Sequence, residues 1–169
     1  MLGESSHCEI RPGEPADAPA LSEVFRTSWA NAYRGIIPHL HLDSMIRRRT
    51  SDWWGTTLRS GGDILVLQVT GTVVGYATLG PTRAKGRYEG EIYEIYISPD
   101  HQGLGFGECL FEACRHHLDR RQLNGLLVWA LADNTIASDF YWRRGGRPVG
   151  STYERFGSQR LKKIAFAWD

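Results

Sequence analysis

Three glycines at every second position, Gly103, Gly105 and Gly107, separate an apolar alternating run from a good helical pattern. A glycine weakens a helix by about 1 kcal/mol relative to alanine, so three of them just before a helix indicate a need for bare backbone. A strand, a glycine-rich turn and a helix N-terminus together form an anion site, because unpaired N–H groups and the positive end of the helix dipole converge there. The stretch therefore predicts a site for phosphate groups rather than a loose turn.

Two well-known phosphate-binding motifs do not match this spacing. A Walker-type loop needs GxxxxGK[ST], but Glu108 follows Gly107 and the next lysine along the chain is Lys162. A dinucleotide-binding fingerprint needs GxGxxG in the first strand–turn–helix unit, whereas these glycines lie mid-chain with a different spacing. The sequence thus argues against a nucleotide-binding regulator.

The pattern that does fit is [Gln/Arg]-x-x-Gly-x-Gly, with Gln102, Gly105 and Gly107. Here the chain resembles the GNAT superfamily of acyl-CoA-dependent N-acetyltransferases, over about residues 8–168. In that family the loop binds the pyrophosphate of coenzyme A through backbone N–H groups, and side chains would hold the phosphates off. The resemblance implies acetyl-CoA as co-substrate, no metal, and transfer of the acetyl group to a primary amine in a ternary complex.

Two further segments carry the resemblance. The family's preceding strand ends in an apolar pair before a proline, as in IYISPD at 95–100, and its backbone holds the pantetheine arm and polarises the thioester. The stretch from Asn134 to Tyr141 matches the family's Asn and aromatic–Tyr helix, whereas Gly146 stands where the family usually has Phe. The cofactor-binding residues so implied are Ile95, Tyr96, Ile97, Gln102, Gly103, Leu104, Gly105, Phe106, Gly107, Asn134 and Tyr141.

Acetyl transfer from a thioester to an amine needs a neutral amine, a polarised carbonyl and a proton for the leaving thiolate. Tyr141 is the predicted general acid, because a phenol with a reference pKa of about 10 keeps its proton at neutral pH; a buried core tyrosine is the alternative. Glu94 is the predicted base, with Glu91 or water as alternatives. A splayed or bulged strand at 94–97 could leave the N–H of Ile97 free for the thioester oxygen.

The acceptor end of the site is the least defined by the sequence. In the family, the first helices and the last hairpin set acceptor specificity, and Trp29, Tyr33 and Glu94 are the candidate acceptor-binding residues. The acceptor is a small-molecule amine or a protein amine. The sequence does not define which amine it is, or which acyl chain is preferred. It also leaves the oligomeric state open, with a homodimer as one alternative. A non-catalytic acyl-CoA-binding or sensing module is the alternative function, and it would not need an acid at Tyr141.

Hydrophobic periodicity places these residues on a mixed α/β (α+β) layer fold. The length suits one domain, and the resemblance implies a single GNAT-like domain across 1–169. By resemblance, this is a central mixed, mostly antiparallel sheet of about six to seven strands, flanked by about four helices and splayed at the cofactor site. Helical spacing predicts a helix ending near Arg34 and a second over about 41–49, with an extension through Leu58 as the alternative, and Asn134 or Asp133 can cap a later helix. The strand patterns are 8–12, 63–69, 72–80, 90–97, 125–132, 148–156 and 160–168.

The composition fits a globular protein. The 169 residues are 41% hydrophobic and 23% charged with a net charge of +1, which offers no basic footprint for nucleic acid. No apolar run approaches the roughly 18–20 residues of a membrane span, and no signal-peptide pattern is visible, so we expect a cytoplasmic protein. Three cysteines without a CxxC, and histidines at 39–41 and 116–117 without further ligands, argue against a disulfide framework and a metal site.

Overall fold

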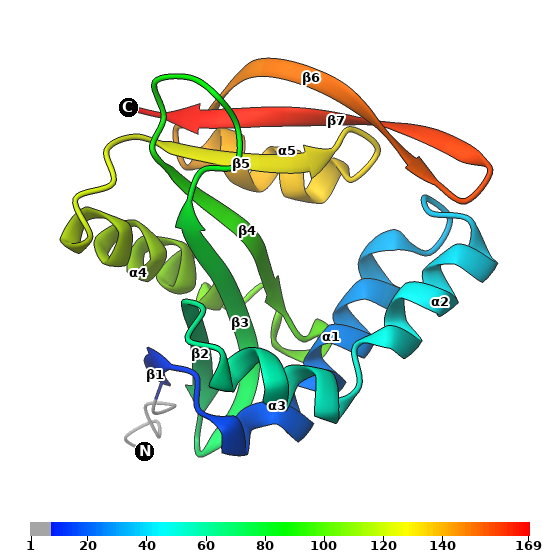
Figure 1. Ribbon diagram of the computed structural model, residues 1–169, viewed down its shortest axis with the longest axis vertical. Helices are drawn as coiled ribbons and strands as arrows, with labels where there is room; N and C mark the ends of the chain where they lie inside the picture. The colour runs from blue at the N-terminus through cyan, green and yellow to red at the C-terminus, as the bar shows by residue number, and fades with distance from the viewer. Residues whose placement is uncertain (1–7) are drawn as a thin grey trace, which may run out of the picture.

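The computed structural model describes residues 8–169, in which one seven-stranded sheet is combined with five α-helices (Figure 1). The strand order is β1-β2-β3-β4-β5-β7-β6, and the neighbouring pairs are antiparallel except for β4 and β5. This is the mixed, mostly antiparallel sheet that the family resemblance predicts. The strands are β1 (Cys8–Pro12), β2 (Ile64–Val69), β3 (Thr72–Pro81), β4 (Gly90–Ile97), β5 (Leu126–Leu131), β6 (Arg147–Phe156) and β7 (Gln159–Trp168).

The helical pattern at 41–58 forms two helices, so the predicted helix ends near Arg49 and its alternative extension through Leu58 is wrong. Thr50 interrupts it with an extended backbone, and its side-chain oxygen accepts a hydrogen bond from the Trp53 N–H at 3.1 Å. A threonine in this position caps a new helix, which a reading of hydrophobic spacing alone overlooks. The helices are α1 (Ala18–Tyr33), α2 (His39–Arg48), α3 (Ser51–Arg59), α4 (Phe106–Arg120) and α5 (Thr135–Arg143).

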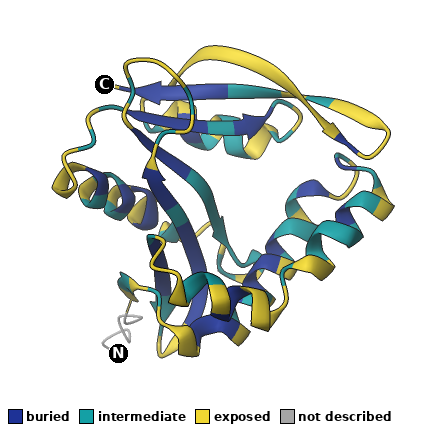
Figure 2. Cartoon of the chain, viewed as in Figure 1, coloured by how far each residue is buried: buried dark blue, intermediate teal, exposed yellow. Residues whose placement is uncertain are grey.

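The helices cover opposite faces of the sheet (Figure 1). On β2, Leu65 and Leu67 pack in one cluster with α4 and α5, whereas Ile64 and Val66 pack in another with α1 and α3. This alternation follows because successive strand side chains point to opposite faces. We call these the α4 face and the α1 face; α2 joins the latter, where it packs near the end of β5. Burial is concentrated in the strands between the two layers, while β6 is exposed along almost its whole length (Figure 2).

Strands β4 and β5 separate in the middle of the sheet. They pair in parallel only from Gly90 to Ile92 on β4, and the rest of β4 pairs with β3 alone. The register of β3 on β4 shifts so that Tyr93 is an extra residue between two paired ones, and such a bulge bends the strand. The result is a gap beside the backbone of residues 94–97, as the family resemblance predicts.

None of the helices in residues 8–169 has the length and apolar character needed to cross a membrane. In the same range, no group of three or more His, Cys, Asp and Glu side chains is arranged to hold a metal ion.

Candidate active site

The glycine loop, residues 102–107, ends in the first turn of α4, which begins at Phe106. Gly103 and Gly105 have φ values of +76° and +85°, in the left-handed region that L side chains rarely adopt. A Cβ atom at either position would meet nothing within 4 Å, so the loop surface is open. Gly105 is the N-cap of α4 and supplies no side-chain hydrogen bond to the first helical N–H groups. These features fit the pyrophosphate of coenzyme A, an anion that helix-terminal N–H groups bind well.

Gly107 answers to a different requirement. A Cβ atom there would lie 3.3 Å from Cε2 of Phe140 on α5, closer than an ordinary van der Waals contact. The interpretation that all three glycines keep side chains away from phosphates is therefore incomplete, because Gly107 also lets α4 and α5 approach each other. Since Phe140 precedes Tyr141, this contact helps to fix the position of the predicted acid.

The other loop side chains leave anion binding to the backbone. The Gln102 amide nitrogen donates a hydrogen bond of 2.9 Å to the Ile97 carbonyl, so this side chain ties the loop to the end of β4. Leu104 is largely exposed, and Phe106 packs against the core cluster on the α4 face. Their predicted part in cofactor binding thus rests on their N–H groups.

Arg144, just after α5, reaches the start of α4. Its guanidinium lies 3.2 Å from the Glu108 carboxylate and stacks 4.5 Å above the Phe140 ring. Its Nε is buried without a hydrogen-bond partner among the described residues. The arginine offsets the charge of Glu108, which would otherwise repel phosphates at this helix end. Sequence reasoning missed this role because two adjacent arginines usually point into solvent.

The gap between β4 and β5 encloses a cavity of about 50 Å³. Its walls come from α1, β4, β5 and α5, so residues far apart in the sequence meet there. The structure therefore brings together several residues that the sequence analysis assigned to catalysis or binding: Tyr33, Glu94, Ile95, Tyr96, Asn134 and Tyr141. Ile97 packs instead against the core on the α4 face, and Trp29 lies outside the cavity lining on the α1 face.

Tyr141 lines the cavity between β4 and β5 and is surrounded by aromatic rings. It is 6% exposed, and its ring is within 6.4 Å of four others, between centroids: Phe111, Phe140, Phe166 and Trp168. Burial raises the pKa of Tyr141 above its ordinary value, because a phenolate is costly in an apolar environment. Tyr141 is thus a core tyrosine that also borders the gap, and its part as general acid stays a prediction.

Gly146, the departure from the family pattern, is explained by the last strand. A Cβ atom at Gly146 would lie 2.4 Å from Cζ2 of Trp168, so no larger residue fits there. The Trp168 ring packs on both Phe111 and Tyr141, and its indole N–H donates to the Arg144 carbonyl at 3.0 Å. Trp168 therefore fills this space and packs on Tyr141 from the end of the last strand.

Asn134 is the N-cap of α5. Its side-chain oxygen accepts a hydrogen bond from the Ala137 N–H at 3.3 Å. The capping reading is thus confirmed. Because the oxygen is used by the cap, the two amide N–H donors remain for groups in the gap.

The two carboxylates on β4 are both held by arginines. The guanidinium of Arg49 donates to the two oxygens of Glu94 at 3.1 and 3.0 Å, and it stacks 4.1 Å above the Trp53 ring. Glu91 is 1% exposed and accepts hydrogen bonds from the Arg83 side chain at 2.7 Å and the Arg83 backbone N–H at 3.0 Å. Neither carboxylate is a free base in this arrangement.

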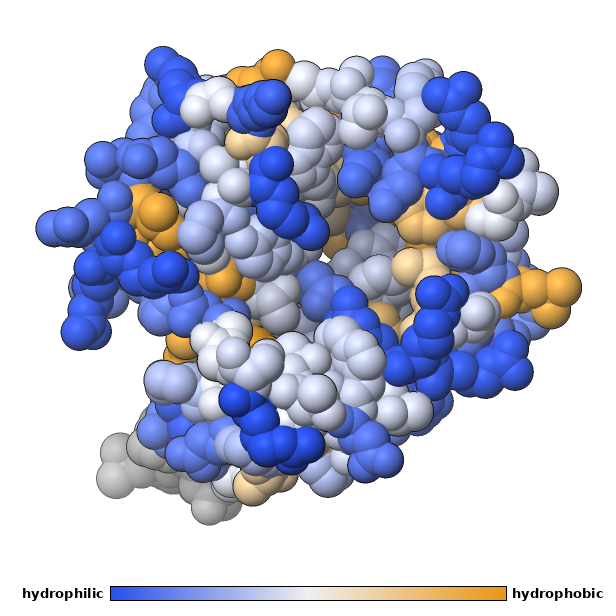
Figure 3. All heavy atoms as spheres, viewed as in Figure 1, coloured by the Kyte–Doolittle hydropathy of each residue, from blue (hydrophilic) through white to orange (hydrophobic). Residues whose placement is uncertain are grey.

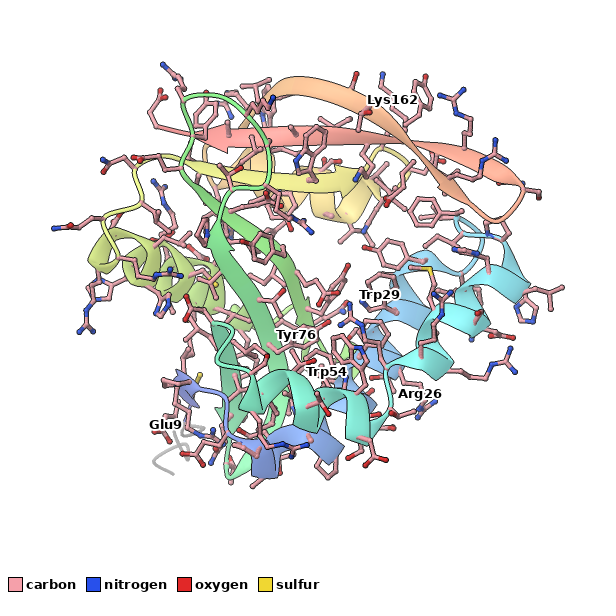
Figure 4. All side chains as sticks on the ribbon, viewed as in Figure 1. Glu9, Arg26, Trp29, Trp54, Tyr76 and Lys162 are labelled. Carbon is pink, nitrogen blue, oxygen red and sulfur yellow. The ribbon has the colours of Figure 1, made fainter. Side chains whose placement is uncertain are left out.

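An aromatic cluster connects α1 with the end of β4. Trp29 stacks on Phe25 with ring centroids 4.7 Å apart, and the hydroxyls of Tyr33 and Tyr96 are hydrogen-bonded to each other. Figure 4 shows Trp29, Trp54 and Tyr76 gathered where α1 and α3 meet the sheet. Trp54 is fully buried and belongs to the core, whereas Tyr33 reaches the cavity.

A second, more open hollow of about 290 Å³ lies between the first helices and the last hairpin. Its lining includes Arg34 after α1, Asp43 on α2 and Gln159 at the start of β7. The space-filling view also shows the molecule hollowed near the centre of the face in view, where the ribbon view places β4 opposite α1 (Figure 3). The first helices and the last hairpin, which line the hollow of about 290 Å³, are the elements that the family resemblance assigns to acceptor specificity.

Known proteins share both the sequence pattern and the fold. The sequence model of the acetyltransferase (GNAT) family matches residues 23–146. An uncharacterized N-acetyltransferase of Bacillus subtilis (strain 168), YuaI, is 28% identical over 161 residues, which cover 94% of this chain and 91% of that protein. Mycothiol acetyltransferase of Nocardia farcinica (strain IFM 10152) is 44% identical over 60 residues, which cover 36% of this chain and 20% of that protein.

Among solved structures, the PaiA N-acetyltransferase of Thermoplasma acidophilum in complex with coenzyme A matches with a TM-score of 0.72 and 21% identity. The match covers 94% of this chain and 98% of that one. The family match spans the glycine loop, the gap and Tyr141. This chain belongs to the GNAT family of acetyltransferases.

Proposed function

We propose that this chain transfers the acetyl group of acetyl-CoA to a primary amine by direct attack in a ternary complex. The observation that carries the proposal is the order of two sites along one segment. The glycine loop follows directly on β4, the strand whose free edge forms the gap. A ligand with phosphates at one end and a thioester at the other can therefore occupy both.

The backbone N–H groups at Gly103, Gly105 and the first turn of α4 hold the pyrophosphate. The unpaired edge of residues 94–97 receives the pantetheine arm, and the Ile97 N–H polarises the thioester oxygen. Asn134 contributes an amide N–H from its free end. Support for these roles comes from the positive φ values, the open loop surface and the separation of β4 from β5.

Tyr141 is the general acid in this mechanism. The amine nitrogen forms a bond to the thioester carbon, the carbon–sulfur bond breaks, and the departing sulfur takes the phenol proton. The surplus proton of the nitrogen returns to the phenolate, so the net products are an amide and a thiol. A phenol with a raised pKa keeps its proton at neutral pH until the thiolate forms beside it.

Glu94 acts by holding Arg49 in place. The amine reaches the site in its neutral form, or its ammonium form loses one proton to water before the attack. This assignment follows from the hydrogen bonds that occupy both oxygens of Glu94 and from the burial of Glu91 under Arg83. The acceptor enters from the α1 face, where the aromatic cluster and the open hollow lie. A relative is named mycothiol acetyltransferase, so small-molecule amines are tested beside protein amines.

An acceptor screen tests this function. The purified chain is incubated with acetyl-CoA and aliphatic amines, amino acids, amine-bearing antibiotics or peptides with a free N-terminus, and release of the coenzyme A thiol is followed. We expect thiol release that depends on one class of amine and exceeds the slow hydrolysis seen without amine. Binding of acetyl-CoA without amine-dependent release by any class would instead indicate the acyl-CoA-sensing module.

A further inference from the structure

Two tyrosine hydroxyls meet at the α1 side of the gap. Tyr33, the last residue of α1, and Tyr96 of β4 share a hydrogen bond between their phenol oxygens, so one hydroxyl donates and the other accepts. Tyr33 is 8% exposed and lines the same cavity as Tyr141. Tyr141 belongs to α5 on the α4 face, so the two phenols border the gap from opposite faces of the sheet.

The surroundings keep the Tyr33–Tyr96 pair protonated and oriented. Burial raises the pKa of Tyr33, and the hydrogen bond with Tyr96 offsets part of that rise. Burial likewise raises the pKa of Tyr96 well above its ordinary value. When Tyr96 donates to the Tyr33 oxygen, that oxygen keeps one lone pair to accept from an amine, and the Tyr33 proton is free for another acceptor.

No carboxylate in the gap competes for this role. Glu94 also lines the cavity, but Arg49 occupies both of its oxygens, and Tyr76 lies 3.5 Å from one of them. Among the described side chains of the lining, the phenols are thus the groups able both to accept a hydrogen bond from an amine and to pass on a proton.

We propose that Tyr33 is a second catalytic tyrosine, whose hydroxyl receives the incoming amine, and that Tyr96 is a positioning residue that orients it. The inference rests on the proposed function. As the carbon–nitrogen bond forms and the carbon–sulfur bond breaks, Tyr141 gives its proton to sulfur. In the same step the nitrogen gives its surplus proton to the Tyr33 oxygen, and Tyr33 passes its own proton to the Tyr141 oxygen. All the phenols recover their protons, and the net change is amide plus thiol.

A double-mutant cycle tests the inference. The variants are Tyr33→Phe, Tyr96→Phe and the pair together, with Tyr153→Phe as a control because Tyr153 is an exposed tyrosine on β6. Tyr33→Phe should lower kcat by about 10²-fold, with little change in the Kd for coenzyme A measured by calorimetry. Tyr96→Phe should cost less, and the pair should be no worse than Tyr33→Phe alone, because residues that act as a unit are not additive.

A proton inventory gives an independent readout. The solvent deuterium dependence of kcat should be curved in the wild-type chain, where several protons move together, and linear in Tyr33→Phe. A purely structural role predicts instead a lower melting temperature, additive losses in the double variant and an unchanged inventory. If the wild-type chain turns over an amine and Tyr33→Phe has the same kcat, this inference is overturned while the proposed function stands. Coenzyme A binding without turnover of any amine overturns the proposed function and this inference with it.

Discussion

Replacing Tyr141 with phenylalanine should lower kcat by about 10²–10⁴-fold, the usual contribution of a positioned acid. The substitution removes one oxygen and almost no volume, so the packing on Phe111 and Trp168 should persist. The loss should therefore appear in kcat rather than in the Kd for coenzyme A or in the melting temperature. Steady-state kinetics with a good acceptor, calorimetry and thermal melting measure the three quantities.

The pH dependence of the wild-type chain should agree with this assignment. Because burial raises the pKa of Tyr141, the alkaline fall in kcat that reports loss of the acid should lie above pH ~10.

Tyr153→Phe is the matched control for Tyr141→Phe, since it removes the same atom from an exposed position on β6. An unchanged kcat in Tyr141→Phe, under conditions where chemistry limits the rate, would remove Tyr141 from the mechanism and leave water or the amine as the proton source.

Replacing Gly105 with valine should weaken coenzyme A binding by about 10²–10⁴-fold. The side chain would cover the N–H groups at the start of α4, and loss of two hydrogen bonds to a charged group costs about 3–6 kcal/mol. The left-handed backbone at φ +85° also makes valine unfavourable, by about 1–2 kcal/mol of folding stability. Calorimetry gives the affinity, and thermal melting gives the stability.

Gly61→Val separates these two effects. Gly61 has a φ of +83° and nothing within 4 Å of its Cβ position, so its backbone strain and open surroundings match those of Gly105. It lies in the turn after α3, outside the glycine loop. Both variants should melt a few degrees lower, whereas only Gly105→Val should lose coenzyme A. Normal binding by Gly105→Val would show that the pyrophosphate lies elsewhere.

Strand alternation, glycine spacing and capping residues predicted those parts of the site that are formed by residues adjacent in the sequence. The alternation at 90–97 has the same bounds as β4, and the strand patterns at 63–69 and 72–80 correspond to β2 and β3, which pair with each other. The glycine loop and the Asn134 cap follow from residue type and spacing at a helix start. These features are encoded within a few residues, so periodicity and turn chemistry suffice to find them.

Contacts between distant segments could not be read in the same way. Arg49 appears as one of three adjacent arginines, which suggests a solvated helix end, yet it binds Glu94 at a separation of 45 residues. The close approach of Gly107 to Phe140 and the replacement of an expected Phe by Gly146 beneath Trp168 depend on tertiary packing. The partners of the two β4 carboxylates could not be predicted either, because only the structure shows that Arg49 holds Glu94 and Arg83 holds Glu91.

Direct transfer between acetyl-CoA and the amine is the central claim, and following a labelled acetyl group tests it most directly. Acetyl-CoA carrying an isotopic label in the acetyl group is mixed with the chain, with and without the acceptor, quenched rapidly and analysed by mass spectrometry. We expect the label to pass to the amine nitrogen at the rate of thiol release, while the protein itself stays unlabelled at every time point. A labelled protein that forms before the product, or thiol release without labelled amine, would contradict the account.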